Sequence, residues 1–270
     1  MPITLVAVAL ALAPAQFQPS VQDWTFNKFT TEQAIQKAAQ AGSTNLELFP
    51  GQTLSTSDES VKVGPEMGDA NTAKLKGFLD AAGLKVVAFG VTGIPKDSEG
   101  ARKLVRWAKG LGIQVINTES VDALDTIEMM VKEFDMKVGF HDHPKRENEP
   151  NYRMWDPNYI YGLVKDRDKR IGSCADTGHW VRSGIKPIDA IRILKGRIVS
   201  SHLKDLNEFS PNGHDVPYGM GVSDAEAILE EYRKIGMSGP VSVEYEYNWD
   251  TNLTEVAQCI GFMRAYKLRK

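Results

Sequence analysis

Hydrophobic and polar positions follow two repeating patterns along most of this chain. In the longer stretches, apolar residues recur every three or four positions, which predicts amphipathic helices. These predicted helices cover 31–41, 71–82, 98–111, 121–134, 158–165, 187–194, 224–235 and 254–266. A glycine or another helix breaker ends most of them, and a short apolar segment then follows.

The short apolar segments predict strands at 20–26, 45–49, 84–89, 113–117, 136–140, 170–175, 197–201 and 240–243. Strands that alternate with helices pair in parallel through right-handed crossovers. Eight such units fit one closed barrel, typically of about 250 residues. We therefore predict an α/β fold, an eight-stranded parallel (β/α)8 TIM barrel, as a single domain over 17–270. An open doubly wound sheet is the alternative, but no glycine follows the first strand at Asn27-Lys28-Phe29.

The first residues form a separate segment. Residues 3–13 are apolar and small, and Ala13-Pro14-Ala15 precedes Gln16. This pattern is typical of a secretory signal, but the basic start of such a signal is missing. The segment is also too short to span a bilayer, which needs about 20 residues. Residues 1–16 are thus either an export signal, with the mature protein outside the cytoplasm, or a leader without structure.

Polar residues gather where the later strands end. They are His141 and His143, Asp176 and His179, His202 and Lys204, and Glu244 and Glu246. Long loops at 50–69, 144–157 and 207–223 also follow strands and belong to the carboxyl-end face of a barrel. Alternate positions on a strand share a face, so Asp176, His202, Glu244 and one of His141 and His143 can meet around one ion. Two carboxylates and two imidazoles favour Mn²⁺, Zn²⁺, Co²⁺ or Fe²⁺, with Mg²⁺ as a further candidate, over Ca²⁺.

Three of these strand ends resemble a known family. Asp176-Thr177-Gly178-His179, His202-Leu203-Lys204-Asp205 and the segment 242–246 look like successive motifs of the xylose-isomerase-like TIM barrels, over about residues 20–266. This superfamily contains sugar isomerases, ketose 3-epimerases, inosose dehydratases and AP endonucleases. The resemblance implies a metal shell of Asp176, His202 and Glu244. The fourth metal ligand of the family, on the fifth strand, corresponds to His141 in this sequence, whereas epimerases have a glutamate there.

The resemblance implies a metal-dependent sugar isomerase or epimerase that abstracts a proton next to a carbonyl and stabilises an enediolate. Glu244 would bind the metal and move a proton, His143 would be the free base, and Lys204 would support the oxyanion. His179 is a further catalytic candidate. Candidates for binding the small sugar or keto-sugar are Glu47, Glu119, His214, Trp24 and Glu246. The alternative reaction is elimination or hydration on a 3-keto-sugar or keto-glycoside.

Each assignment has a plainer structural alternative. Asp176 can cap the helix that follows it. His202 can be a hydrogen-bonded core residue, and Glu244 can form a salt bridge with Lys204. Aromatic residues such as Trp24 more often pack near a barrel mouth than bind a ligand.

Composition narrows the class of protein. The net charge of −3 argues against a nucleic-acid surface, and five histidines are few for the metal cluster of an AP endonuclease. Two cysteines cannot form a disulfide framework, and Cys174 suits a small buried apolar residue. We expect no nucleic-acid and no membrane partner, and leave a homo-oligomer open. A non-catalytic barrel that binds a sugar for a partner is the remaining class.

Overall fold

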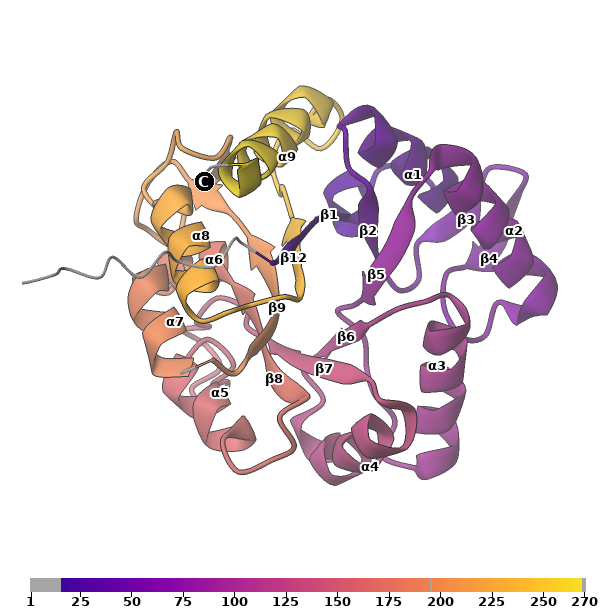
Figure 1. The fold of residues 1–270 in the computed structure, drawn as a ribbon, viewed down its shortest axis with the longest axis horizontal. Helices are drawn as coiled ribbons and strands as arrows, with labels where there is room; N and C mark the ends of the chain where they lie inside the picture. The colour runs from indigo at the N-terminus through magenta and orange to yellow at the C-terminus, as the bar shows by residue number, and fades with distance from the viewer. Residues whose placement is uncertain (1–15, 195, 269–270) are drawn as a thin grey trace, which may run out of the picture.

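A computed structural model describes residues 16–194 and 196–268, and within them eight parallel strands close into a barrel surrounded by helices (Figure 1). The barrel strands are β1 (Gln18–Gln22), β2 (Asn45–Leu48), β5 (Lys85–Phe89), β6 (Val115–Thr118), β7 (Lys137–His141), β8 (Ile171–Asp176), β9 (Ile198–Leu203) and β12 (Pro240–Val243). Their order around the barrel is β1-β12-β9-β8-β7-β6-β5-β2. The predicted TIM barrel is confirmed.

The helices follow the predicted pattern closely. They are α1 (Thr31–Gln40), α2 (Gly68–Ala82), α3 (Ser98–Gly110), α4 (Leu124–Phe134), α5 (Pro157–Val164), α6 (Thr177–Arg182), α7 (Pro187–Leu194), α8 (Ala225–Lys234) and α9 (Leu253–Leu268). Side-chain caps explain several starts: Thr30 and Gln33 form a capping box at α1, and Asp156 caps α5 ahead of Pro157. Of these helices, α6 had no predicted range, although Asp176 was named as a candidate cap for a helix at this place.

Two sequence predictions need correction. The first strand ends at Gln22, and Asp23–Phe26 form a 3-10 helix, η1, because the Gln22 side chain accepts a hydrogen bond from the Trp24 amide. Two short hairpins were also not predicted: β3 (Thr53–Ser55) pairs with β4 (Asp58–Lys62) within the loop at 50–69, and β10 (Asp205–Leu206), just before the loop at 207–223, pairs with β11 (Asp215–Val216) inside it. A second 3-10 helix, η2 (Val121–Ala123), precedes α4.

The leader predicted at 1–16 lies outside the described residues, apart from Gln16. Among the residues that are described, no helix is both long enough and apolar enough to cross a membrane.

Strand register determines which side chains meet at the carboxyl end of the barrel. Asp176 on β8 pairs with His202 on β9, and His202 also pairs with Ser242 on β12. His141 on β7 pairs with Cys174 on β8. Because these strands are neighbours and end at one rim, their last residues form one cluster.

Candidate active site

Four donor atoms from four neighbouring strand ends form a buried group at the carboxyl end of the barrel. His141 Nε2 lies 3.0 Å from His202 Nδ1 and 3.6 Å from Asp176 Oδ2. His202 Nδ1 lies 3.9 Å from the same Asp176 oxygen and 3.3 Å from Glu244 Oε2. All four side chains are buried. They are the residues that the sequence nominated as metal ligands, and the structure brings them together.

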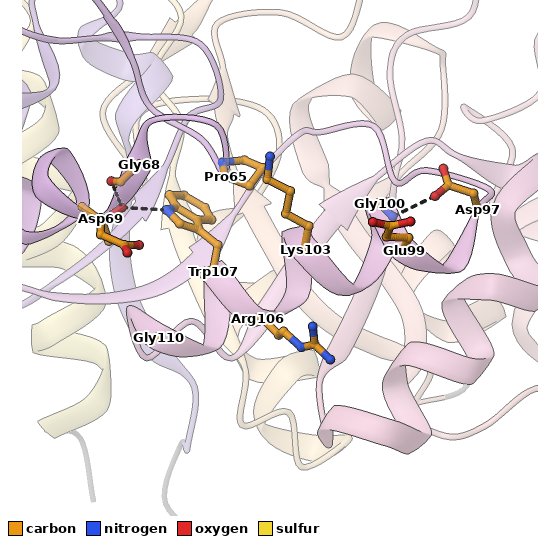
Figure 2. A pocket seen from close by; sticks show the side chains of 11 residues that line it. Pro65, Gly68, Asp69, Asp97, Glu99, Gly100, Lys103, Arg106, Trp107 and Gly110 are labelled. Atoms are coloured by element: carbon orange, nitrogen blue, oxygen red, sulfur yellow. Dashed lines mark hydrogen bonds between the residues drawn. The ribbon is translucent and has the colours of Figure 1, made fainter.

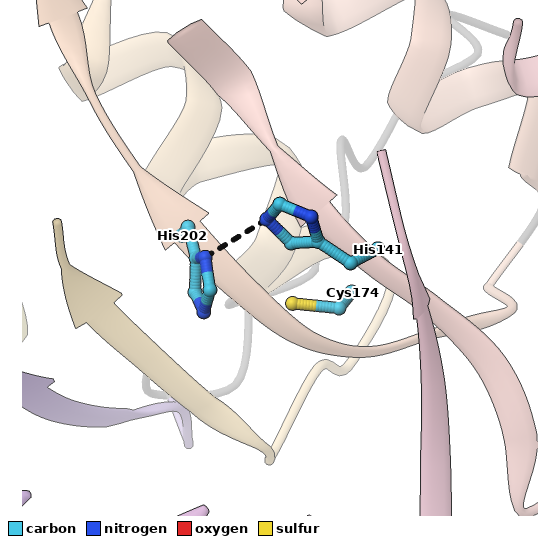
Figure 3. Close-up of side chains that lie close together, drawn as sticks. All are labelled: His141, Cys174 and His202. Atoms are coloured by element: carbon cyan, nitrogen blue, oxygen red, sulfur yellow. Dashed lines mark hydrogen bonds between the residues drawn. The ribbon is translucent and has the colours of Figure 1, made fainter. Parts of the chain in front are cut away.

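His202 contacts both this cluster and Glu47 on β2, and Figure 3 shows its ring beside that of His141. Its Nε2 is 2.9 Å from Glu47 Oε1, and Glu47 also accepts from Asn117 Nδ2 at 2.7 Å and from Ser242 Oγ at 2.6 Å. Burial alone would lower the pKa of His202, but the neighbouring Cys174, Glu47 and Glu244 raise it well above its ordinary value. Glu47, nominated for substrate binding, is fully buried, and both of its oxygens are used by these partners.

Cys174 lies close to His141 and His202 (Figure 3). Burial raises the pKa of its thiol to about 11. Its sulfur forms, with one ring nitrogen of His141 and one of His202, a group of donor atoms that lie within 4.8 Å of one another.

The Lys204 ammonium is fully buried between three carboxylates. Its Nζ lies 2.8 Å from Asp176 Oδ2, 2.6 Å from Glu244 Oε2 and 2.9 Å from Glu246 Oε2. Burial opposes the charge, but the carboxylates hold the pKa of Lys204 well above its ordinary value. Gly178 makes room for this side chain, since a Cβ there would lie 2.7 Å from the Lys204 stem. The salt bridge between Glu244 and Lys204, which the sequence suggested as the alternative role of Glu244, is therefore formed in the structure.

Asp176 also caps α6, as its Oδ1 accepts from the His179 amide at 2.8 Å. Its other oxygen, Oδ2, faces the cluster. Burial alone would raise the pKa of Asp176, yet its neighbours His179 and Lys204 hold it well below the ordinary value. Asp142 supports the same residue by accepting from the Asp176 amide at 2.8 Å. Asp176 can therefore cap α6 with one carboxylate oxygen and contribute the other oxygen to the group of four donor atoms.

His179 lies beside the cluster, with Nε2 3.5 Å from Asp176 Oδ2. Burial lowers the pKa of His179 well below its ordinary value, so the ring is neutral. Arg182 Nη1 lies 3.3 Å from His179 Nδ1. Because a guanidinium can only donate, Nδ1 accepts this bond and Nε2 carries the hydrogen. His179 also belongs, with His141, Asp176 and Glu244, to a group of side chains whose donor atoms all lie within 4.8 Å of one another.

Arg182 was not among the residues predicted from sequence. Its guanidinium contacts Glu246 Oε2 at 3.0 Å and Asp215 Oδ2 at 3.1 Å, and its Nε donates to Gly213 O at 3.0 Å. It therefore ties α6 to the loop at 207–223 and to the strand end after β12. The one feature of the sequence that could have indicated a role for Arg182 is its position one helical turn after His179.

The predicted substrate-binding residues Glu246 and Trp24 lie at the edge of the cluster. Glu246 is partly exposed, and Trp24 Nε1 donates to its Oε1 at 3.3 Å. Burial opposes the charge of Glu246, but Lys204 outweighs this effect and lowers its pKa. Trp24 packs on Phe49, with ring centroids 4.5 Å apart, and meets Trp249 edge-on at 6.0 Å.

A second group lies on the other side of His141. Glu119 Oε1 is hydrogen-bonded to His143 Nδ1, and Tyr152 donates to Glu119 Oε2 at 3.2 Å. The His143 ring stacks on His179 with centroids 5.0 Å apart. Burial opposes ionisation of Glu119, but the bond to His143 keeps its pKa below the ordinary value. Glu119 therefore contacts the predicted base, and Tyr152 is a partner that the sequence did not reveal.

His214, the last nominated residue, lies in the loop at 207–223. Its ring stacks on Tyr247 with centroids 4.2 Å apart. Within the described contacts, neither ring touches the four donor atoms directly.

A cavity of about 740 Å³ opens elsewhere, between α2 and α3 (Figure 2). Trp107 and Lys103 line it, together with Asp69 and Asp97. Its lining includes none of the nominated site residues, so it is separate from the cluster.

The spacing of the four donor atoms can be compared with the geometry of a divalent cation site. Atoms that share one such ion at ordinary bond lengths lie roughly 3 to 4 Å apart. The measured separations of His141, His202, Asp176 and Glu244 fall in this range. A carboxylate behind His202 is also what a metal-binding imidazole usually has. The residues therefore fit a divalent transition metal.

Comparison with known proteins agrees with the fold. The sequence model of the family described as xylose isomerase-like TIM barrel matches residues 35–266. The structure of an uncharacterised protein from Parabacteroides distasonis ATCC 8503 is similar, with a TM-score of 0.73 at 28% identity over 93% of this chain and 99% of that one.

Two further proteins carry functional names. Inosose dehydratase from Clostridium tetani (strain Massachusetts / E88) is 34% identical over 91 residues, which are 32% of this chain and only 27% of that relative. The IOLI protein with a bound zinc atom has a TM-score of 0.66 at 17% identity, over 93% of this chain and 98% of that one. At this identity the second likeness concerns the fold alone.

Proposed function

The chain belongs to the xylose isomerase-like TIM barrel family, and from this premise we propose that it binds one divalent metal and moves a proton next to the carbonyl of a sugar or keto-sugar. The observation that carries the proposal is the group of four donor atoms, 3.0 to 3.9 Å apart along its measured edges. Isomerisation or epimerisation is the reaction we favour.

His141, Asp176, His202 and Glu244 would hold the metal. His202 is preferred to His179 because the Glu47 carboxylate lies behind its Nε2, which is the usual support of a metal-binding imidazole. When bound, the metal would polarise the substrate carbonyl and offset negative charge that develops on its oxygen. Imidazole and carboxylate ligands suit Mn²⁺, Zn²⁺, Co²⁺ or Fe²⁺, with Mg²⁺ less favoured.

Lys204 would provide a permanent positive charge beside the reacting atoms. Its ammonium stays protonated between Asp176, Glu244 and Glu246. A buried, preorganised cation stabilises an oxyanion better than water does, because it does not need to reorient during the reaction.

His143 would be the base that removes the carbon-bound proton. It is partly exposed, so a substrate can reach it, and Glu119 binds its Nδ1. That bond places the hydrogen on Nδ1 and leaves Nε2 free to accept a proton. Glu119 would thus act through His143 as a positioning residue. The ring stack on His179 keeps the base beside the cluster.

Dehydration of a keto-sugar is the second candidate, and the match to an inosose dehydratase favours it. Elimination begins with the same proton abstraction next to a carbonyl. It differs in the next step, in which a hydroxyl on the neighbouring carbon leaves as water. The proposed roles of Lys204 and His143 are the same in both reactions.

Two other classes find less support. Cleavage of abasic DNA would need a basic surface, and the net charge is −3. A barrel that only binds sugar would not need Lys204 and the Glu119–His143 pair so close to the four donor atoms.

The experiment combines metal analysis with solvent-deuterium exchange on the purified chain. Ketohexoses and 3-keto-glucosides are incubated in D₂O with the metal-containing protein and with protein treated with a chelator. We expect about one metal per chain and exchange of one carbon-bound proton only when the metal is present. Release of water from the substrate would favour the dehydratase. Absence of metal, or exchange that persists after chelation, would disprove the metal-dependent reaction.

A further inference from the structure

A second cavity, of about 520 Å³, lies beside the candidate active site at the carboxyl end of the barrel. Its walls come from η1 and the segment that follows it, and from the loop with the β3–β4 hairpin after β2. The side chains that line it include Trp24, Asn27, Phe29, Phe49, Gln52 and Thr56. The volume is within the range of small-molecule sites, roughly 300 to 1,000 Å³.

Trp24 connects this cavity to the active site. It lines the cavity, and its Nε1 donates to Glu246 Oε1 at 3.3 Å. The other oxygen of Glu246 lies 2.9 Å from Lys204 Nζ. The Trp24 side chain therefore lies between the cavity and the charged residues Glu246 and Lys204. A ligand longer than one ring can contact both the cavity and these residues.

The lining has the chemistry that binds a sugar ring. Trp24 and Phe49 pack at 4.5 Å between centroids and supply apolar ring faces. A pyranose presents C–H groups on its faces and hydroxyls at its edge, so it matches an aromatic wall flanked by amide and hydroxyl groups. Asn27, Gln52 and Thr56 are such groups.

The charge of the lining favours an uncharged ligand. Lys28 and Glu59 are the charged side chains that line this cavity, and their charges cancel. A phosphorylated sugar would instead need an excess of positive charge or a set of backbone amides aimed at the phosphate.

The cavity is also preformed. Gln52 is buried, and its amide nitrogen donates to the carbonyl oxygens of Phe26 at 3.3 Å and Phe29 at 3.0 Å. These bonds hold the segment after β1 against the hairpin loop after β2. A wall that is already in place lowers the ordering cost of binding.

We propose that this cavity binds the second ring of a neutral glycoside, whose keto-sugar unit reacts at the adjacent active site. The proposal rests on the proposed function, because it assigns a substrate class to the same site. The natural substrate would then be a keto-disaccharide or a comparable glycoside, and a free monosaccharide would occupy only part of the binding surface.

The test compares D-fructose with two disaccharides that contain a fructose unit, lactulose and isomaltulose. Dissociation constants are measured by titration calorimetry on the metal-containing protein, and deuterium exchange is measured in parallel. We expect at least one disaccharide to bind about tenfold more tightly than D-fructose, which is the size expected for one stacked aromatic contact. Phe49→Ala, which removes part of the aromatic wall, should bring the ratio of the two constants close to one.

Thr56→Trp is the second variant, because it fills the cavity from an exposed turn and does not disturb the core. It should abolish the preference for the disaccharide as Phe49→Ala does. Lys103→Ala, in the separate cavity between α2 and α3, is the matched control and should keep the wild-type ratio (Figure 2).

The outcomes separate the two proposals. If D-fructose binds and exchanges but neither disaccharide binds more tightly, the glycoside proposal is wrong and the proposed function stands. If both variants keep a tenfold preference for the disaccharide, the second ring binds elsewhere and the proposal also fails. If none of the three sugars binds or exchanges, the glycoside proposal fails, and the exchange experiment with ketohexoses and 3-keto-glucosides decides the proposed function separately.

Discussion

Glu47 Oε1 lies 2.9 Å from His202 Nε2, although the two residues are 155 positions apart in the sequence. Both side chains are fully buried. Since a carboxylate only accepts hydrogen bonds, Nε2 carries the hydrogen, and the other ring nitrogen faces His141 and Glu244. A carboxylate in this position fixes the orientation of a metal-binding imidazole and increases its basicity.

The first prediction concerns Glu47→Gln. This change keeps the shape of the side chain but removes the charge behind His202. We expect the dissociation constant of the metal to rise about 10- to 100-fold, as for other carboxylates that support a metal-binding histidine. Competition with a chelator measures it, and Glu59→Gln, an exposed carboxylate on β4, is the control. Equal metal affinity in both variants would show that Glu47 does not support the site.

The second prediction distinguishes the two imidazoles beside Asp176. His202→Gln should lose the metal, whereas His179→Gln should retain it, because the Glu47 carboxylate supports the His202 ring. Asp176→Ala and Glu244→Ala should lose the metal and serve as positive controls. Metal content after dialysis is measured by mass spectrometry. The opposite result for the two histidine variants would replace His202 by His179 in the ligand set.

The strand-end residues could be predicted because parallel strands in a barrel end at one rim. Residue type and strand parity nominated Asp176, His202, Glu244 and one of the two histidines at the end of β7, and the family resemblance selected His141; the structure brings these four side chains together. The order of elements was predictable for a similar reason, since each helix ends in a breaker and each strand is a short apolar run.

Contacts across the barrel could not be predicted. Glu47 on β2 contacts His202 on β9 because closure of the barrel brings these two strands to face each other. A single sequence does not show which side chains on opposite sides of the barrel come within contact distance. Arg182 was missed because α6 has only six residues, too few for a helical pattern to be visible. Trp24 was wrongly assigned to the first strand. It lies in η1, which begins where the Gln22 side chain accepts a hydrogen bond from the Trp24 amide, and this bond leaves no clear signal in the sequence.

The third prediction concerns pH and stability. Burial raises the pKa of Asp215 to about 7, although the Lys204 and Arg182 cations oppose the shift. Between about pH 4 and pH 7 the folded protein therefore keeps a proton that the unfolded chain releases, so this carboxyl makes the free energy of unfolding fall as pH rises. The slope is about 1.4 kcal/mol per pH unit for one group. Below pH 4 the contribution is fully present, and above pH 7 it is lost.

Asp215→Asn removes this titration. We expect the variant to gain stability relative to the wild type as pH rises from 4 to 7, measured by denaturant unfolding at each pH. Asp189→Asn, which changes an exposed carboxyl on α7, should keep the wild-type dependence. Parallel curves for Asp215→Asn and the wild type would mean that Asp215 ionises normally.

The last prediction separates the metal ligand from the base on β7 and its following loop. His141 Nε2 faces His202 and Asp176, whereas His143 Nδ1 is bound by Glu119 and its ring is partly exposed. His141→Gln should therefore lose the metal. His143→Gln should keep the metal but reduce deuterium exchange into substrate by about 10² or more, the usual contribution of a general base.

Glu119→Gln tests the positioning role within the same experiment. It should keep the metal and lower kcat with little change in KM, because the carboxylate acts on the base and not on substrate binding. Tyr152→Phe, which removes the hydroxyl hydrogen bond to Glu119 and leaves the carboxylate in place, should have a smaller effect and is the matched control. If His143→Gln exchanges the proton at the wild-type rate, His143 is not the base. Because Glu119 would then have no imidazole to act through, a large loss of kcat in Glu119→Gln alone would make this carboxylate the base.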